Sequence, residues 1–207
     1  MAEELVFYTN PMSRGRIVRW MLEEIGAPYR TEILDFGTTM KAPAYLALNP
    51  MGKVPTITHG DTIVTECAAI CAYLADVFPA AKLAPPADRR GDYYRWLFFA
   101  AGPLETAASN HALGFEPPAD KQGMMGYGTY AATIDTLEKA VSGKHYVAGD
   151  SFSAADVYIG SHLMWGMQFG TIEKRQAFED YWARLAERDA HRRAEKLDDA
   201  AMPARDV

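Results

Sequence analysis

The sequence predicts a protein of the α/β plus all-α class, with two domains. Up to about residue 78, short apolar and β-branched runs alternate with stretches of helical periodicity. Residues 79–90 include Pro79, Pro85 and Pro86, a composition typical of a linker. Beyond them only helical periodicity remains. The predicted division is therefore an α/β domain over residues 1–78, a linker over 79–90 and an α-helical domain over 91–207.

The composition is that of an ordinary globular protein. Of the 207 residues, 49% are hydrophobic and 23% are charged, so a core can form without disulfides. The net charge of -6 argues against nucleic acid as a partner, because that affinity rests on clustered Lys and Arg. The chain starts with an acidic segment unlike an export signal, and its apolar runs are far shorter than the roughly 20 residues of a membrane span. A cytoplasmic location without a membrane partner is expected.

Seven elements are expected in the first domain, and their order is βαβαββα. The strands are predicted at Leu5–Tyr8, Tyr29–Leu34, Val54–Thr58 and Thr62–Val64, and the helices at Ile17–Ile25, Lys41–Leu48 and Glu66–Val77. A turn at 59–61 joins the last two strands. A parallel strand pair extended by an antiparallel hairpin, with helices on its faces, is the thioredoxin-like pattern.

The first helix is predicted to be amphipathic. Its apolar residues recur at helical spacing from Ile17 to Ile25. Four charged residues fall off that apolar face, namely Arg16, Arg19, Glu23 and Glu24.

The second domain reads as a bundle of helices. They are predicted at Asp92–Ala112, Lys121–Val141, Ala154–Trp165 and Arg175–Glu187. Gly123, Gly126 and Gly128 disfavour the start of the second of these, so that helix either bends or begins near Thr129. The polar tail from Asp198 to Val207 is expected to fray.

Four local motifs stand out against this background. They are Tyr8-Thr9-Asn10-Pro11-Met12-Ser13-Arg14, Asn49-Pro50-Met51-Gly52-Lys53-Val54-Pro55, Thr65-Glu66-Cys67 and Gly149-Asp150-Ser151-Phe152-Ser153-Ala154-Ala155-Asp156. The last is a helix capping box, to which we assign no catalytic role. In their order and spacing, the four motifs resemble the glutathione S-transferase superfamily over nearly the whole chain. The closer resemblance is to bacterial-type members with a Ser/Thr-type active site.

The resemblance implies a glutathione transferase. Such an enzyme holds glutathione, its co-substrate, as the thiolate and conjugates it to a small hydrophobic electrophile, and it is usually a homodimer. No metal is expected, and the two cysteines, Cys67 and Cys71, have neither CxxC nor zinc-ligand spacing. Two other readings remain open: a glutathione-dependent peroxidase or disulfide reductase, and a non-catalytic interaction module of the same fold.

The resemblance also assigns the residues that bind glutathione. It makes the Val54–Pro55 bond cis, which leaves the Val54 backbone groups open to pair with the extended peptide. Glu66 then takes the γ-glutamyl amino group and the Cys67 N–H takes the carboxylate, with Cys standing where the family usually has Ser. Lys53 and Lys41 are assigned to glutathione carboxylates. The simpler alternatives are a rigid strand entry, a helix cap and solvated lysines.

The residue that activates the thiol is predicted among Ser13, Thr9 and Asn10. Lowering a thiol pKa by two units requires about 2.7 kcal/mol. A hydrogen bond to a charged group supplies roughly 1.5–3 kcal/mol, so one well-placed hydroxyl suffices. Ser13 stands where Ser-type members place that hydroxyl, whereas Thr9 and Asn10 match other bacterial classes. The alternative for Ser13 is a plain helix N-cap.

The second substrate is expected to meet an apolar, Met-rich lining supplied by the helical domain. Most of the available side chains must nonetheless be ordinary core. The candidates are Tyr94, Trp96, Phe98, Phe99, Met124, Met125, Trp165, Met167 and Phe169.

Overall fold

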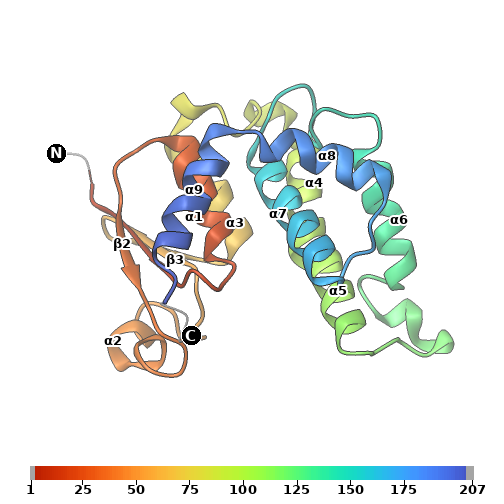
Figure 1. The fold of residues 1–207 in the computed structure, drawn as a ribbon, viewed down its shortest axis with the longest axis horizontal. Helices are drawn as coiled ribbons and strands as arrows, with labels where there is room; N and C mark the ends of the chain where they lie inside the picture. The colour runs from red at the N-terminus through yellow and green to blue at the C-terminus, as the bar shows by residue number, and fades with distance from the viewer. Residues whose placement is uncertain (1–2, 204–207) are drawn as a thin grey trace. The chain divides into compact units, whose positions relative to one another are not determined.

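The computed structural model describes residues 3–203, which form two compact units (Figure 1). The first unit extends to Lys82 and takes in the chain again from Arg188 onward. The second unit is Leu83–Glu187. The predicted helical domain therefore differs at its C-terminal boundary, because the last helix belongs to the first unit.

A four-stranded sheet lies at the centre of the first unit. Its strands are β1 (Leu5–Thr9), β2 (Arg30–Ile33), β3 (Thr56–His59) and β4 (Thr62–Thr65), in the spatial order β2-β1-β3-β4. β1 pairs parallel with β2 and antiparallel with β3, which pairs antiparallel with β4. This is the predicted thioredoxin-like topology. β3 begins at Thr56 rather than at Val54, since Pro55 has no N–H to donate to a ladder.

The helices α1 (Gly15–Ile25) and α3 (Cys67–Val77) pack against each other and against this sheet. Fully buried side chains of both helices and of the strands make the core, among them Phe7, Trp20, Ile57 and Ile70. The predicted helix 41–48 is shorter than expected, because α2 covers only Pro43–Leu46 and follows a 3-10 turn at Thr39–Lys41.

The C-terminal segment is ordered where fraying was predicted. Helix α9 (Asp189–Ala200) runs beside α1 (Figure 1), and Asp198 is buried against it. The expectation of a frayed tail is therefore wrong for residues 198–200, because Asp198 forms an ion pair with the buried Arg19 of α1. Residues 204–207 lie outside the described residues.

The second unit is helical, as predicted. Its helices are α4 (Gly91–Phe99), α5 (Glu105–Ala112), α6 (Tyr130–Val141), α7 (Ala154–Phe169) and α8 (Gln176–Ala186). The helix predicted over 92–112 is interrupted by a π-helical segment, Ala100–Leu104, that contains Pro103. Proline cannot donate the backbone bond that a regular helix needs there.

The later of the two predicted starts for the glycine-rich helix is the one observed. A short 3-10 helix covers Ala119–Met124, and α6 begins at Tyr130. Thr129 caps α6 by accepting a hydrogen bond from the Ala132 N–H at 3.1 Å. The predicted capping box is also present at the start of α7, between Ser153 and Asp156. None of the helices over residues 3–203 is long and apolar enough to cross a membrane.

Candidate functional site

The predicted binding and catalytic motifs of the first unit meet at one end of its sheet. β1 ends at Thr9, just before the loop that carries Asn10 and Ser13. β3 runs antiparallel to β1, so its beginning lies at the same end, with Tyr8 opposite Thr56. Thr56 is in turn opposite Thr65, the last residue of β4. The segments that precede β3 and follow β4, Val54–Pro55 and Glu66–Cys67, therefore lie at the end of the sheet where β1 finishes.

The loop between β1 and α1 is held by its own polar groups. The Asn10 side-chain amide donates to the Leu34 carbonyl at 2.8 Å, and its oxygen accepts from the Met12 N–H at 2.9 Å. The Ser13 hydroxyl donates to the Asn10 carbonyl at 2.6 Å and accepts from the Gly15 N–H at 3.0 Å. The N-cap position of α1 is Arg14 and not Ser13, so Ser13 accepts from the first helical N–H from one residue before the N-cap.

The three predicted catalytic residues differ in how accessible they are. Ser13 is half-buried, and its hydroxyl is engaged by the Asn10 carbonyl and the Gly15 N–H. Asn10 is buried, and both ends of its side chain are engaged in the loop. Thr9 is fully buried, and its hydroxyl has no hydrogen-bond partner among the described residues. Of the three side chains, only that of Ser13 is half-buried rather than buried.

The Val54–Pro55 peptide bond is cis, as the resemblance implies. The Val54 N–H and C=O have no hydrogen-bond partner within residues 3–203. The preceding residue is fixed from inside the unit, because the Lys53 carbonyl accepts from the Tyr45 hydroxyl at 2.5 Å and from the Asn49 amide at 2.8 Å. Tyr45 was not predicted as a site residue, because its apolar neighbours in the sequence give no signal of a polar contact.

Helix α3 begins beside this segment with a strained residue. Glu66 occupies the N-cap position at φ 67 and ψ 120, a conformation that a non-glycine residue rarely adopts. No side-chain cap bond is present at this end of α3 within the described residues, so capping does not account for Glu66. Its side chain is exposed. The buried Cys67 thiol donates to the Arg14 carbonyl at 3.6 Å, which joins the start of α3 to the loop that carries Ser13.

The two predicted lysines have different environments. Lys41 donates to the Gly52 carbonyl at 2.6 Å and to the Met51 carbonyl at 3.3 Å. Gly52 has φ 56, and an added Cβ there would lie 2.8 Å from the Lys41 ammonium, so glycine is required at this turn. Lys53 is exposed, and its ammonium has no partner within residues 3–203.

This end of the sheet can therefore bind an extended, charged peptide. It offers open backbone groups at Val54, the N-terminus of an 11-residue helix, a carboxylate at Glu66 and an ammonium at Lys53. No cluster of three metal-ligating side chains occurs in the described part of the chain.

The apolar candidates of the second unit separate by burial. Trp96 is buried and belongs to the core, whereas Tyr94, Phe98, Met124 and Phe169 are exposed. The remaining candidates, Phe99, Met125, Trp165 and Met167, are half-buried. Exposed apolar side chains are available to a small molecule. The assignment of these residues to the lining of a substrate site stays a prediction.

Comparison with protein families gives two matches. Residues 12–77 match the model described as glutathione S-transferase, N-terminal domain. Residues 128–189 match the glutathione S-transferase C-terminal domain.

Curated and solved relatives cover most of the chain. Glutathione S-transferase GST-4.5 of Xanthomonas campestris is 28% identical over 190 residues, which span 86% of this chain and 91% of that protein. Glutathione S-transferase GstA of Escherichia coli O157:H7 is 30% identical over 156 residues, 70% of this chain and 73% of that protein. A glutathione transferase structure from Methylococcus capsulatus is 27% identical with TM-score 0.78, covering 95% of this chain and 99% of that one. A sphingomonad glutathione S-transferase complexed with glutathione is 26% identical with TM-score 0.75, covering 94% and 98%.

Proposed function

This chain belongs to the glutathione S-transferase family, and from that premise we propose that it conjugates glutathione to a small hydrophobic electrophile through a thiolate held by Ser13. The observation that carries the proposal is the meeting of three elements at one end of the sheet. They are the open backbone of Val54, the start of α3 at Glu66 and Cys67, and the half-buried Ser13 hydroxyl.

Glutathione is a short peptide with two carboxylates, one amino group and one thiol. In the proposed complex its cysteinyl backbone pairs with the Val54 N–H and C=O as an added strand. Its γ-glutamyl amino group meets Glu66, and the carboxylate beside it lies at the positive end of α3. Lys53 and the remaining donor of Lys41 serve the carboxylates.

Ser13 is proposed to stabilise the thiolate. Its hydroxyl donates to the Asn10 carbonyl at 2.6 Å without ligand, so it has to turn from that carbonyl to the sulfur. One hydrogen bond is exchanged for another, and the charged acceptor makes the new one the stronger by about 1–2 kcal/mol. Stabilising the thiolate lowers the thiol pKa, which increases the fraction of nucleophile at neutral pH.

Two of the rival assignments lose support on geometry. The Thr9 hydroxyl is fully buried, and the Asn10 side chain already serves the loop. The alternative function, reduction of a peroxide or disulfide, is favoured only if Thr9 or Asn10 holds the glutathione sulfur. Conjugation through Ser13 is therefore the better supported function. A homodimer, a cytoplasmic location and a hydrophobic electrophile remain parts of the proposal.

The test is titration calorimetry with reduced glutathione, followed by activity of the Ser13→Ala variant. We expect wild type and Ser13→Ala to bind glutathione with similar affinity. We expect the variant to lose about 5- to 30-fold in kcat/KM, because it loses the net gain of about 1–2 kcal/mol from exchanging the bond to the Asn10 carbonyl for the bond to the thiolate. Thr9→Ser, which keeps the buried hydroxyl, serves as the matched control. Full activity of Ser13→Ala would move the role to Thr9 or Asn10.

A further inference from the structure

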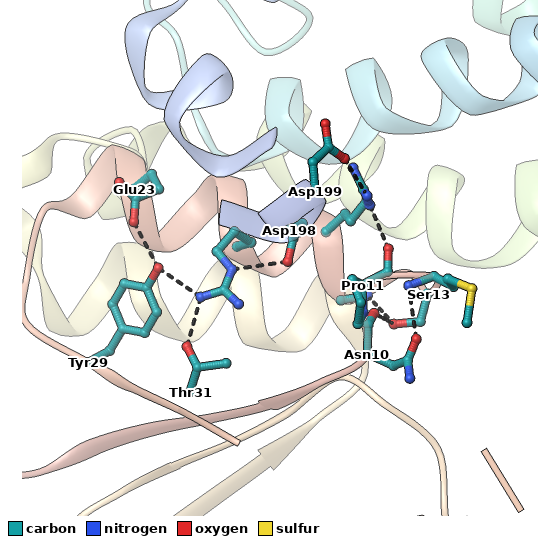
Figure 2. Close-up of polar contacts among 12 residues, drawn as sticks. Asn10, Pro11, Ser13, Glu23, Tyr29, Thr31, Asp198 and Asp199 are labelled. Atoms are coloured by element: carbon teal, nitrogen blue, oxygen red, sulfur yellow. Dashed lines mark hydrogen bonds and ion pairs between the residues drawn. The ribbon is translucent and has the colours of Figure 1, made fainter. Parts of the chain in front are cut away.

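Arg16 connects the loop that carries Ser13 to helix α9. Its Nε donates to the Pro11 carbonyl at 2.6 Å, and its Nη2 donates to the Asp199 carboxylate at 2.7 Å. Figure 2 shows the two interactions, with Asp199 on one side and Pro11 on the other. The two nitrogen atoms belong to one rigid guanidinium plane. The position of the Asp199 carboxylate therefore constrains the direction in which the same group donates to the Pro11 carbonyl.

Asp199 is held in this place by the pairing of α9 with α1 as a whole. The two helices run antiparallel, and α9 with its N-cap residue Arg188 forms ion pairs with α1. Four of these pairs, all between described residues, are Arg16–Asp199, Arg19–Asp198, Glu23–Arg193 and Glu24–Arg188. Among these pairs, the arginines of α1 precede its glutamates along the chain, and the arginines of the α9 segment likewise precede its aspartates. Only the antiparallel register brings opposite charges together along the whole length.

The pair next to Asp199 is the most buried of the four. The side chains of Arg19 and Asp198 are 5% and 2% exposed, and their closest N–O distance is 3.2 Å. Arg19 also donates to the Thr31 hydroxyl at 2.7 Å and to the Tyr29 hydroxyl at 3.1 Å (Figure 2). Asp199 therefore projects from a helical turn that is anchored in the unit.

The loop is consequently held from two sides. Asn10 ties it to the residue that follows β2, through the Leu34 carbonyl. Arg16 ties it to α1 and α9, through the Pro11 carbonyl. Ser13 lies two residues beyond Pro11, and its hydroxyl bonds to the carbonyl of Asn10, immediately before Pro11.

We propose that Arg16 is a positioning residue for the thiolate-binding loop and that α9 contributes Asp199 to orient it. This inference rests on the proposed function, because it takes Ser13 as the residue that meets the glutathione sulfur. Arg16 acts through the Pro11 carbonyl. It fixes the backbone from which the Ser13 hydroxyl turns towards the thiolate, and it makes no contact with the thiolate itself.

The variants Arg16→Lys, Arg16→Ala and Asp199→Ala test the proposal, with Arg193→Ala as the matched control. Lysine keeps the charge but has no fork with which to hold both acceptors. Arg193→Ala removes another ion pair between α1 and α9, that with Glu23, which lies about two helical turns from the loop. The control therefore reports on weaker docking of α9 without a change at Pro11.

Two measurements separate positioning from general damage. The first is the thiol pKa of bound glutathione, obtained from the ultraviolet absorbance of the thiolate against pH. The second is the dissociation constant of S-methylglutathione, which lacks the thiol and reports only on the rest of the site.

We expect both Arg16 variants to raise the pKa of the glutathione thiol by about one unit. At a pH below that pKa, the fraction of thiolate then falls about tenfold. Asp199→Ala should lower the fraction of thiolate by only about two- to threefold, because the Arg16–Asp199 ion pair is partly exposed. S-methylglutathione should bind all variants within about twofold of wild type, and Arg193→Ala should leave the pKa unchanged.

An unchanged thiol pKa in both Arg16 variants would overturn the inference while leaving the proposed function intact. The same rise in Arg193→Ala, or a parallel loss of S-methylglutathione binding in the Arg16 variants, would overturn it too, since the effect would then be general. A wild-type protein that binds no glutathione would overturn the proposed function itself, and that outcome is visible before any variant is made.

Discussion

Gly15, the first residue of α1, has no space for a side chain. A Cβ at this position would lie 1.9 Å from the Thr9 hydroxyl oxygen and 3.0 Å from that of Ser13. Thr9 is fully buried at the end of β1, so it has no room to withdraw. Gly15 thus lets the helix start close to the strand end and keeps the Ser13 hydroxyl within reach of the first helical N–H.

Gly15→Ala should destabilise the protein by about 1–3 kcal/mol, because overpacking displaces buried atoms. Gly91→Ala is the matched control, since Gly91 is likewise the first residue of a helix but has nothing within 4 Å of an added Cβ. That control should be neutral or stabilising by up to about 1 kcal/mol. Urea unfolding of both variants measures the difference, and equal stabilities would show that Thr9 and Gly15 are not in close contact.

The two cysteines should differ in reactivity. Complete burial raises the pKa of the Cys71 thiol to about 12, so almost none of it is thiolate at neutral pH. Cys67 is also buried, but it is 7% exposed whereas Cys71 is 0% exposed. Alkylation of the native protein should therefore modify Cys67 before Cys71, as peptide mass spectrometry can measure, with denatured protein as the control that labels both. Modification of Cys71 first would contradict its burial.

The sequence could identify the residue types of the candidate site but not their environments. Ser13, with Thr9 and Asn10 as rivals, is a candidate from the sequence because all three are small polar residues near a strand end. Only the three-dimensional structure shows that Thr9 is enclosed and that Asn10 is occupied. The roles of Tyr45 and Arg16 were missed for the same reason, since each binds a backbone carbonyl that has no sequence signal.

At the scale of one element, the start of α7 depends on a buried carboxylate. Asp156 accepts hydrogen bonds from the N–H groups of Val147 and Ser153 and from the hydroxyls of Ser153 and Tyr181, at 2.5 to 2.9 Å. The capping box was predictable from the spacing of Ser153 and Asp156. The contacts with Val147 and Tyr181 were not, because they depend on the packing of other segments.

Burial raises the pKa of the Asp156 carboxyl above its usual value, although the Tyr181 hydroxyl and the other donors lower it. A raised pKa in the folded state means that the native protein binds this proton more tightly than the unfolded chain does. Between the unfolded and folded pKa values, the contribution of Asp156 to the free energy of unfolding therefore falls as pH rises, and above the folded value it is constant.

Asp156→Asn should lower the free energy of unfolding by about 1–3 kcal/mol. The variant replaces one of the two acceptor oxygens with an NH2 group, so a buried donor loses its partner. Asparagine does not titrate, so the gap between variant and wild type should narrow as pH rises from about 4. Urea unfolding at several pH values measures the gap. A gap that widens with pH would mean that the four donors outweigh burial and hold the folded pKa below the unfolded one.

At the scale of the whole molecule, the packing of α9 against α1 was not predicted from the sequence pattern. Arg16, Arg19, Glu23 and Glu24 were assigned to the polar side of α1, whereas Arg19 is buried. Their charge order is complementary to that of Arg188, Arg193, Asp198 and Asp199, which is the signal that could have located α9. Helical periodicity alone cannot reveal it, because the partner segment lies more than 160 residues away along the chain.

The ion pairs of α9 should differ in strength according to their burial. Arg188 binds Glu24 with two nitrogens, at 2.6 and 2.7 Å, and the Glu24 side chain is only 7% exposed. A double-mutant cycle with Arg188→Gln and Glu24→Gln should give a coupling of about 1–3 kcal/mol. The matched cycle for Arg193 and Glu23, where Arg193 is mostly exposed, should give less than about 1 kcal/mol. Unfolding in urea supplies both values, and equal couplings would contradict the ranking.

The return of α9 to the first unit has a consequence for the growing chain. A ribosome makes residues 3–82 before the second unit, but it makes α9, which packs against α1, after the second unit. The Arg19 guanidinium, which is enclosed in the finished protein, has no carboxylate to meet until Asp198 has been synthesised and has left the exit tunnel. The N-terminal unit can therefore be completed only after every residue of the second unit has been synthesised.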